Sequence, residues 1–413
     1  MHPGEPQATQ ATVPSVDALA AEVERLVLRL VPATTEAVPD EFPWIVAGEA
    51  RRHGVSEIAI LVVDLEQTVL TPLAPAPPEL APQDIDSTLA GRCFQTEQPL
   101  TSSAAPDGEL ALWVPLIDGS ERMGVLYLRL PDVSERLIEA CQILAGLVAE
   151  LLVSKTQYGD SLALARRRGT MTLAAELRWS LLPPLTYRTP RAGVACILEP
   201  AYEVAGDAFD YAMNGETLHL AIFDGMGHGL EASRITNLAI GGYRLGRRRS
   251  LDLLDTYALI DEAVAEQFGD ERFVTAQLAT LDVVDGTLRW VNAGHPHPLL
   301  LRRGRLASEL VSEPSLPLGM GGTPIEVTYE SLEPGDSLLF FTDGVVEARS
   351  PGGERFGQQR LVDFTRRALS AQQTLSETVR RLVRSVREHR DGPPRDDATV
   401  LFVEWHPPPS TSS

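Results

Sequence analysis

The sequence predicts an α+β protein of two domains, and three observations lead to this prediction. The chain of 413 residues is longer than a single hydrophobic core usually organises. Apolar, β-branched runs typical of strands occur on both sides of a helical stretch that ends in two prolines. The composition, 44% hydrophobic and 23% charged, is that of a globular protein.

The N-terminal part has the pattern of one small domain. Residues 56–74 form an apolar run that fits a buried strand, and residues 110–131 fit two strands around a turn. Residues 134–153 place apolar side chains on one helical stripe. Strands flanked by helices over this length indicate an α+β domain at residues 16–155, after a disordered N-terminus at residues 1–15.

A helical pattern continues over residues 156–186. Leu173, Leu177 and Leu181 recur every four residues, and Pro183-Pro184 ends the pattern. We therefore expect a helical linker. Its leucine stripe leaves two alternatives open: it pairs with a second chain as a coiled coil and forms a homodimer, or it packs on its own domain.

Strand-like and helical patterns alternate in residues 187–405. The helical patterns cover residues 230–248, 251–267 and 358–389. The strand-like runs are AGVACILEPAYE, LHLAIFD, VTAQLATLDVVDGTLRWVNAG, DSLLFFTDG and ATVLFVEW. Two antiparallel sheets with helices outside would bury these runs. Residues 406–413 are expected to form a disordered tail.

Charge and hydropathy exclude several classes of function. The formal net charge of -21 repels nucleic-acid phosphates. The longest apolar stretch, residues 143–153, contains Glu150 and is too short to span a bilayer, and the N-terminus lacks the pattern of a signal peptide. We expect a cytoplasmic protein that binds neither nucleic acid nor membrane. Its cysteines, which lie among apolar residues, are expected to be buried and reduced: Cys93, Cys141 and Cys196.

Aspartates recur where apolar runs begin or end. They are Asp207 in EVAGDAFDY, Asp224 in AIFDGMGHG, Asp343 in LLFFTDGVVEA, and Asp396 with Asp397 in RDDATVLFVEW. Carboxylates gathered at a rigid sheet edge repel one another and resist ionisation unless a cation neutralises them. Hard oxygen ligands favour Mg²⁺ or Mn²⁺ over zinc. The pattern therefore predicts a divalent-metal site.

The turn after Asp224 contains further candidates. Gly225 and Gly227 allow a tight turn with positive φ, which brings a backbone carbonyl toward the metal. A single Asp-Gly pair has another interpretation, a strand-to-helix turn with a capping acid. His228 also has two interpretations: a general acid for the leaving group, or a loop histidine that orders Asp224. We favour the second for His228.

An ordered set of motifs between Leu177 and Trp405 resembles a known family. The motifs are LRWSLLPP, EVAGDAFDY, FDGMGHGLEAS, VNAGHPHPLLL, LPLGM, LEPGDSLLFFTDGVVEAR and RDDATVLFVEW. They resemble the SpoIIE-like branch of the PPM (type 2C) metal-dependent Ser/Thr protein phosphatases. The N-terminal part resembles a GAF sensor domain more weakly, through LAGRCFQTEQPL and VPLIDGSERMGVLYL.

The phosphatase resemblance implies an αββα sandwich with two Mn²⁺ or Mg²⁺ ions at one end. By matching motif, Asp207 and Asp224 would hold or bridge the metals, assisted by the Gly225 carbonyl. Asp343 and Asp396 would complete the second ion's shell, with Asp397 outside it. The chain departs from the family pattern in two positions, one small and one aromatic: Ala205 and Trp179.

The resemblance also implies a function. Two ions would activate a water for in-line attack on phosphoserine or phosphothreonine. The implied substrate is a STAS-type anti-anti-sigma factor in partner switching. The GAF-like domain would either control the activity in response to a signal or small ligand, or serve only to form the homodimer together with the linker helix. The alternative is a catalytically silent phosphatase fold that serves as a signal-dependent binding module.

Overall fold

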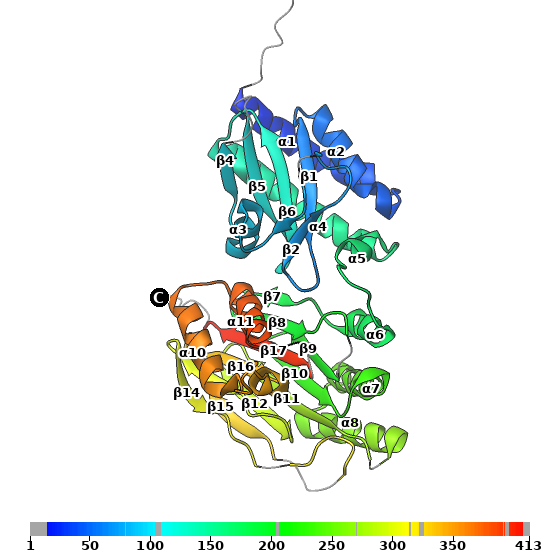
Figure 1. The fold of residues 1–413 in the computed structure, drawn as a ribbon, viewed down its shortest axis with the longest axis vertical. Coiled ribbons are helices and arrows are strands. Elements are labelled where there is room, and N and C mark those ends of the chain that lie inside the picture. Colours follow the sequence, from blue (N-terminus) through cyan, green and yellow to red (C-terminus); the bar gives the residue numbers. More distant parts are fainter. Residues whose placement is uncertain are drawn as a thin grey trace, which may run out of the picture. The chain divides into compact units, whose positions relative to one another are not determined.

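The protein is represented by a computed structural model in two compact units (Figure 1). Unit 1 comprises residues 1–118 and 122–167, and unit 2 comprises residues 119–121 and 168–413. The described residues are 15–78, 80–103, 109–203, 206–269, 271–313, 315–321, 326–390, 392 and 396–407. The expected disordered segments, 1–15 and 406–413, therefore lie outside the described residues except at Ser15, His406 and Pro407.

Unit 1 contains an antiparallel sheet in the order β3-β2-β1-β6-β5-β4. Its strands are β1 Glu57–Val63, β2 Val69–Pro72, β3 Gln83–Asp84, β4 Leu100–Ser103, β5 Leu110–Asp118 and β6 Glu121–Leu130. Its helices are α1 Val16–Thr34, η1 Pro39–Glu41, α2 Phe42–Arg52, α3 Leu89–Thr96, α4 Glu135–Thr156 and α5 Ser161–Ala165.

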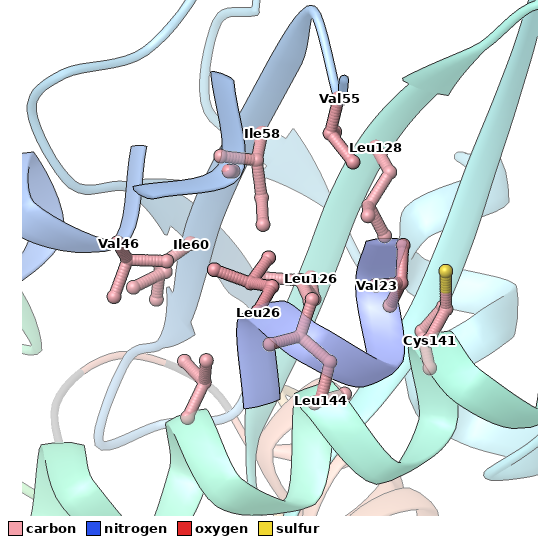
Figure 2. Packing of buried hydrophobic residues seen from close by; sticks show 14 of the residues in the cluster. Val23, Leu26, Val46, Val55, Ile58, Ile60, Leu126, Leu128, Cys141 and Leu144 are labelled. Carbon is pink, nitrogen blue, oxygen red and sulfur yellow. The ribbon is translucent and has the colours of Figure 1, made fainter. Parts of the chain in front are cut away.

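Both faces of this sheet are covered. Ile58, Ile60 and Val62 of β1 face a core shared with α1, α2 and α4, part of which Figure 2 shows. The alternate residues of the same strand face a second core with α3: Ala59, Leu61 and Val63. A strand buried on both faces is apolar without alternation, which explains the continuous apolar run in the sequence.

The prediction of a single strand over residues 56–74 is wrong, because the chain reverses between β1 and β2. The Asp64 carboxylate accepts hydrogen bonds from the backbone nitrogens of Thr68 (2.6 Å) and Val69 (3.0 Å). Gln67 takes a positive φ of 53°. A side-chain acceptor thus builds the turn without glycine or proline, the usual turn signals.

Helix α4 is long and apolar enough to cross a membrane by length and composition. Ser134 caps its start, because its hydroxyl accepts a hydrogen bond from the nitrogen of Leu137. The core of unit 1 buries one side of the helix, including Leu144 and Val148. The apolar character of α4 is therefore accounted for, on this side, by packing in the core.

The continuous helix predicted for residues 156–186 is also wrong. Residues 166–172 separate α5 from α6, Leu173–Leu181. Thr172 starts α6 as a new helix, since its side chain accepts a hydrogen bond from the nitrogen of Ala175.

Two of the three leucines of the α6 stripe do not pack on their own unit. Leu173 is 65% exposed and Leu177 is 38% exposed, whereas Leu181 is half-buried and the buried residues of this helix are Ala174, Ala175 and Arg178. The packing alternative is therefore contradicted for Leu173 and Leu177, and the pairing of the stripe with a second chain stays a prediction.

Unit 2 contains two antiparallel sheets, in the orders β15-β12-β11-β10-β9 and β14-β13-β16-β17-β8-β7. The first consists of β9 Asp207–Asn214, β10 Thr217–Gly225, β11 Val274–Asp282, β12 Thr287–Ala293 and β15 Thr328–Ser331. The second consists of β7 Thr186–Arg188, β8 Ala192–Glu199, β13 Leu299–Arg302, β14 Arg305–Glu309, β16 Ser337–Phe341 and β17 Ala398–Trp405.

The two sheets form the inner layers of an αββα sandwich (Figure 1). Helices α7 Gly229–Arg248 and α8 Leu253–Phe268 pack on the five-stranded sheet. Helices α9 Asp343–Glu347, α10 Gly357–Ser370 and α11 Leu375–His389 pack on the six-stranded sheet. The predicted sandwich is confirmed for this unit. The predicted buried, reduced cysteines are confirmed as well.

Candidate active site

The first two predicted aspartates face each other on neighbouring strands. Asp207 begins β9 and Asp224 lies near the end of β10, and the antiparallel register pairs these two residues directly. Asp207 is 1% exposed, whereas Asp224 is half-buried. Because cross-strand neighbours lie close together, the pairing brings two carboxylates to one edge of the five-stranded sheet.

The second sheet reaches Asp207 through hydrogen bonds. The Thr342 hydroxyl, directly after β16, donates to the Asp207 carboxylate at 2.7 Å and accepts from the nitrogen of Thr399 at 2.9 Å. The Asp397 carboxylate, just before β17, accepts from the Asp207 nitrogen at 3.1 Å. The Thr342 bond orients the Asp207 side chain, the Asp397 bond holds its backbone, and both join the ends of the two sheets.

Asp343 and Asp396 lie at the same end of the second sheet and are exposed. Asp343 is the first residue of α9, and the Asp396 carboxylate accepts a hydrogen bond from the nitrogen of Asp397 at 3.0 Å. The predicted aspartates therefore come together, with two of them facing solvent and two buried. The buried pair is Asp207 and Asp397.

Glycines allow the backbone segments that carry these aspartates to approach closely. A methyl group on Gly206 would overlap with the carbonyl of Gly225, and one on Gly225 would overlap with the Thr236 hydroxyl. The positive φ expected in this turn occurs at Gly227, at 96°, and not at Gly225. Gly225 is thus required for close packing, while Gly227 makes the turn.

The carboxylates hold their protons strongly in the metal-free protein. Burial raises the pKa of Asp224 to about 8, and repulsion from Asp343 and Asp396 acts in the same direction. Burial together with the charges of Asp397 and Asp224 raises the pKa of Asp207 well above its ordinary value. Asp343 and Asp396 are exposed as whole residues, but partial desolvation of their carboxylates, together with the nearby charge of Glu347, still raises their pKa values. The site therefore favours added positive charge.

The donor set fits a hard divalent cation. All the predicted side-chain ligands are carboxylates, which Mg²⁺ and Mn²⁺ prefer. Burial first, and repulsion between the carboxylates second, raise the pKa values of Asp207 and Asp224. Among the described residues, however, no three His, Cys, Asp or Glu side chains converge closely enough to hold an ion. The structure thus contains an electrostatically coupled carboxylate cluster rather than an assembled coordination sphere.

An arginine that the sequence did not single out reaches this cluster. Arg178 of α6 is 2% exposed, and its guanidinium lies 3.8 Å from the Asp397 carboxylate. Burial raises the pKa of Asp397 to about 7, and the Arg178 charge opposes that rise. Arg178 lies within the LRWSLLPP motif, but only the fold shows that the side chain points inward.

The histidines near the site have different roles. His228 is exposed at the position before α7 and makes no side-chain capping hydrogen bond. His295 is buried and accepts or donates a 2.8 Å hydrogen bond with the Thr275 hydroxyl. Burial lowers the pKa of His295 to about 3, so its ring is neutral. Asn292 binds the backbone of His295 and the ring of His297, which shapes the turn between β12 and β13.

Of the two departures from the family pattern, Trp179 is described and Ala205 lies outside the described residues. The Trp179 indole donates a 2.8 Å hydrogen bond to the carbonyl of Ala201 and packs against the core between the sheets. The aromatic residue therefore anchors α6 to unit 2.

Replacing Gly344 by alanine is expected to disrupt the cluster without removing a carboxylate. The new methyl group would overlap with the carbonyl of Asp397, so either the Asp343 turn or the start of β17 must move. We expect the affinity for Mn²⁺ to fall about 10- to 100-fold, as when groups that orient ligands are lost, measured by calorimetry. Gly352→Ala, where a methyl group meets no close neighbour, is the matched control; equal affinities in the two variants would contradict this account.

Comparisons with known proteins concern mainly unit 2. The family described as Stage II sporulation protein E (SpoIIE) matches residues 214–406, a range that begins after Asp207. Protein IcfG of Synechocystis is 25% identical over 51% of this chain and 37% of its own length. Phosphoserine phosphatase RsbU of Bacillus subtilis is 23% identical over 57% of this chain and 70% of its own length. This chain thus spans little more than a third of IcfG.

A solved structure, the SiaA-PP2C domain of Pseudomonas aeruginosa, has a TM-score of 0.48 and 22% identity. The match covers 61% of this chain and 98% of the SiaA-PP2C chain.

In sequence, unit 2 is thus similar to the SpoIIE/PPM phosphatase domain family, whose model matches just under half of the chain. The αββα sandwich with carboxylates at one end is the architecture in which this likeness lies.

Proposed function

We propose that this protein is a metal-dependent phosphatase that hydrolyses phosphoserine or phosphothreonine on a regulatory protein. The observation that carries the proposal is the coupled cluster of Asp207, Asp224, Asp343 and Asp396 at one end of the sandwich. The Gly225 carbonyl and these four carboxylates would hold two Mn²⁺ or Mg²⁺ ions. When bound, such ions supply an activated water and neutralise charge on the phosphoryl oxygens.

The protein's own residues fix the site before substrate arrives. Thr342 orients the Asp207 carboxylate through its hydroxyl hydrogen bond, and Asp397 restrains the Asp207 backbone. Asp224 is held on β10 by pairing with both neighbouring strands. Rigid support of this kind lowers the cost of ordering the reacting groups.

The test is metal-dependent phosphate release from a phosphoserine peptide by the full chain. We expect activity that requires Mn²⁺ or Mg²⁺ and is lost in Asp343→Asn. Asp363→Asn changes a half-buried carboxylate on α10 that pairs with Arg366; it is the matched control and should retain activity. If the protein binds metal but releases phosphate from no phosphopeptide, the result would favour the silent binding module instead.

We further propose a STAS-type anti-anti-sigma protein as the substrate, in partner switching in the cytoplasm. The likeness to RsbU, whose name describes a phosphoserine phosphatase, supports a phosphoserine-bearing protein substrate. Unit 1 would act as a GAF-like sensor with a possible small-molecule ligand, and the exposed leucines of α6 would contribute to a homodimer. Deleting residues 1–150 should then change the rate or the metal affinity.

A further inference from the structure

A cavity of about 370 Å³ lies in unit 2 away from the carboxylate cluster. Its volume is in the range of small-molecule sites. Its walls include Thr217 and His219 of β10, Tyr243 and Arg247 of α7, Arg289 of β12, and Tyr329 of β15. β10 runs from Thr217 to Gly225, so the cavity and the carboxylates lie at opposite ends of one strand.

The cavity carries an excess of positive charge. Asp210 is 1% exposed, and its two carboxylate oxygens each lie 3.0 Å from a nitrogen of Arg244. Arg247 binds the same carboxylate at 3.2 Å. The single Asp210 carboxylate therefore neutralises the guanidinium groups of Arg244 and Arg247 only in part. Of these two arginines, Arg247 lines the cavity.

The remaining charges of the lining do not cancel this excess. Arg289 adds a second cation, and its guanidinium lies 5.9 Å from the centre of the Tyr329 ring. The lining contains one carboxylate, Asp252, which accepts a hydrogen bond from the nitrogen of Asp255 at the start of α8. In a chain with a net charge of -21, this local excess of positive charge favours an anion over a cation.

The cavity also contains a hydroxyl group that is poorly hydrogen-bonded. The Tyr243 side chain is 2% exposed, and its hydroxyl interacts with the Arg247 side chain but makes no hydrogen bond of normal geometry among the described residues. A buried polar group with such a poor partner gains from a better one. Apolar side chains of Leu253 and Val327 complete the lining, so a ligand needs both a polar and an apolar part.

We propose that this cavity binds a small organic anion whose carboxylate or phosphate group faces Arg247 and Arg289. Its apolar body would lie against Leu253 and Val327, and the Tyr243 hydroxyl would bind one of its oxygens. Helix α7 begins beside the turn after Asp224 and ends at the cavity, so the ligand would contact the far end of that helix. The proposal does not depend on the phosphatase activity.

The experiment follows the imidazole of His219 by NMR in the full chain, labelled at its histidine rings. Passage over a chelating resin frees the protein of divalent ions beforehand, so that no soluble polycarboxylate competes for the cavity. The probes are benzoate and phenylphosphonate, with neutral benzamide as control, and His219→Gln assigns the resonance. Burial and the Arg247 charge both lower the pKa of His219, so a bound anion should raise it.

We expect the chemical shifts of the His219 imidazole to change saturably with at least one anion, with a Kd of about 1 mM, and not to change with benzamide. Binding of benzoate alone would identify a carboxylate ligand, and binding of phenylphosphonate alone a phosphate-type ligand. No saturable shift with either anion, or equal shifts with benzamide, would overturn the proposal.

Two variants test the assigned contacts. Arg289→Gln alters an exposed side chain and should weaken binding about tenfold, as should Tyr243→Phe. Arg305→Gln changes an exposed arginine outside the cavity and should bind as the wild type does. Wild-type affinity in both cavity variants, with unchanged thermal unfolding, would contradict the assignment.

Discussion

Replacing Asp224 by asparagine is expected to lower kcat/KM for a phosphopeptide on the order of a thousandfold, about 4 kcal/mol of transition-state stabilisation. Asp224 faces Asp207 across the strand pair and shares its electrostatic environment with Asp343 and Asp396. An amide keeps the shape of the side chain but removes the charge that attracts the cations. Phosphate release at saturating Mn²⁺ measures the effect.

The same substitution should raise the stability of the metal-free protein. Burial and repulsion make the ionised Asp224 unfavourable, and asparagine removes both costs at neutral pH. Each kcal/mol of relief raises Tm by roughly 2–4 °C in a domain of this size. A variant that lost activity because it misfolds would instead unfold at a lower temperature, so thermal unfolding in EDTA separates the two causes. Retained activity with normal Mn²⁺ dependence would refute a ligand role for Asp224.

The stability of metal-free unit 2 is expected to fall as the pH rises from about 4 to about 8. In the folded state the pKa of Asp224 is raised to about 8 and that of Asp397 to about 7, whereas an unfolded aspartate titrates near pH 3.9. The folded protein thus binds more protons in this window, and deprotonation costs stability. The slope is about 1.4 kcal/mol per pH unit for each carboxylate still protonated in the folded state.

Denaturant unfolding in EDTA at several pH values between 6 and 8 measures this slope. Saturating Mn²⁺ should flatten it, because the cation stabilises the ionised carboxylates. Asp224→Asn should reduce the slope without metal, whereas Asp363→Asn should not. Stability that stays constant or rises between pH 6 and 8 in EDTA would contradict the raised pKa values.

Several features of the site could be predicted from local sequence. Asp207, Asp224, Asp343 and Asp396 each adjoin an apolar run, so a strand assignment already places them at sheet edges. The glycines after Asp224 and Asp343 mark sites of close backbone approach or turning. These signals are local, and the structure brings the four residues to one end of the sandwich.

Other features depend on contacts between distant segments. The bond from Thr342 to Asp207 spans 135 positions, and the bond from Asp207 to Asp397 spans 190. The inward direction of Arg178 depends on which face of α6 packs, and leucine spacing suggested a different face. The hairpin between β1 and β2 has a single turn residue, Asp64, as its signal inside a long apolar run, and the hydrogen bonds from Thr68 and Val69 that make the turn are visible only in the structure. Periodicity does not encode these choices.

The central claim is that the four aspartates hold divalent cations, and calorimetric titration of the full chain with Mn²⁺ tests it most directly. We predict binding of two ions per chain in the wild type, with proton release at pH 7 because cations displace the protons held by the raised pKa values. We predict that Asp224→Asn loses at least one of these ions. Absence of binding at about 1 mM Mn²⁺, or equal binding by the wild type and Asp224→Asn, would contradict the claim.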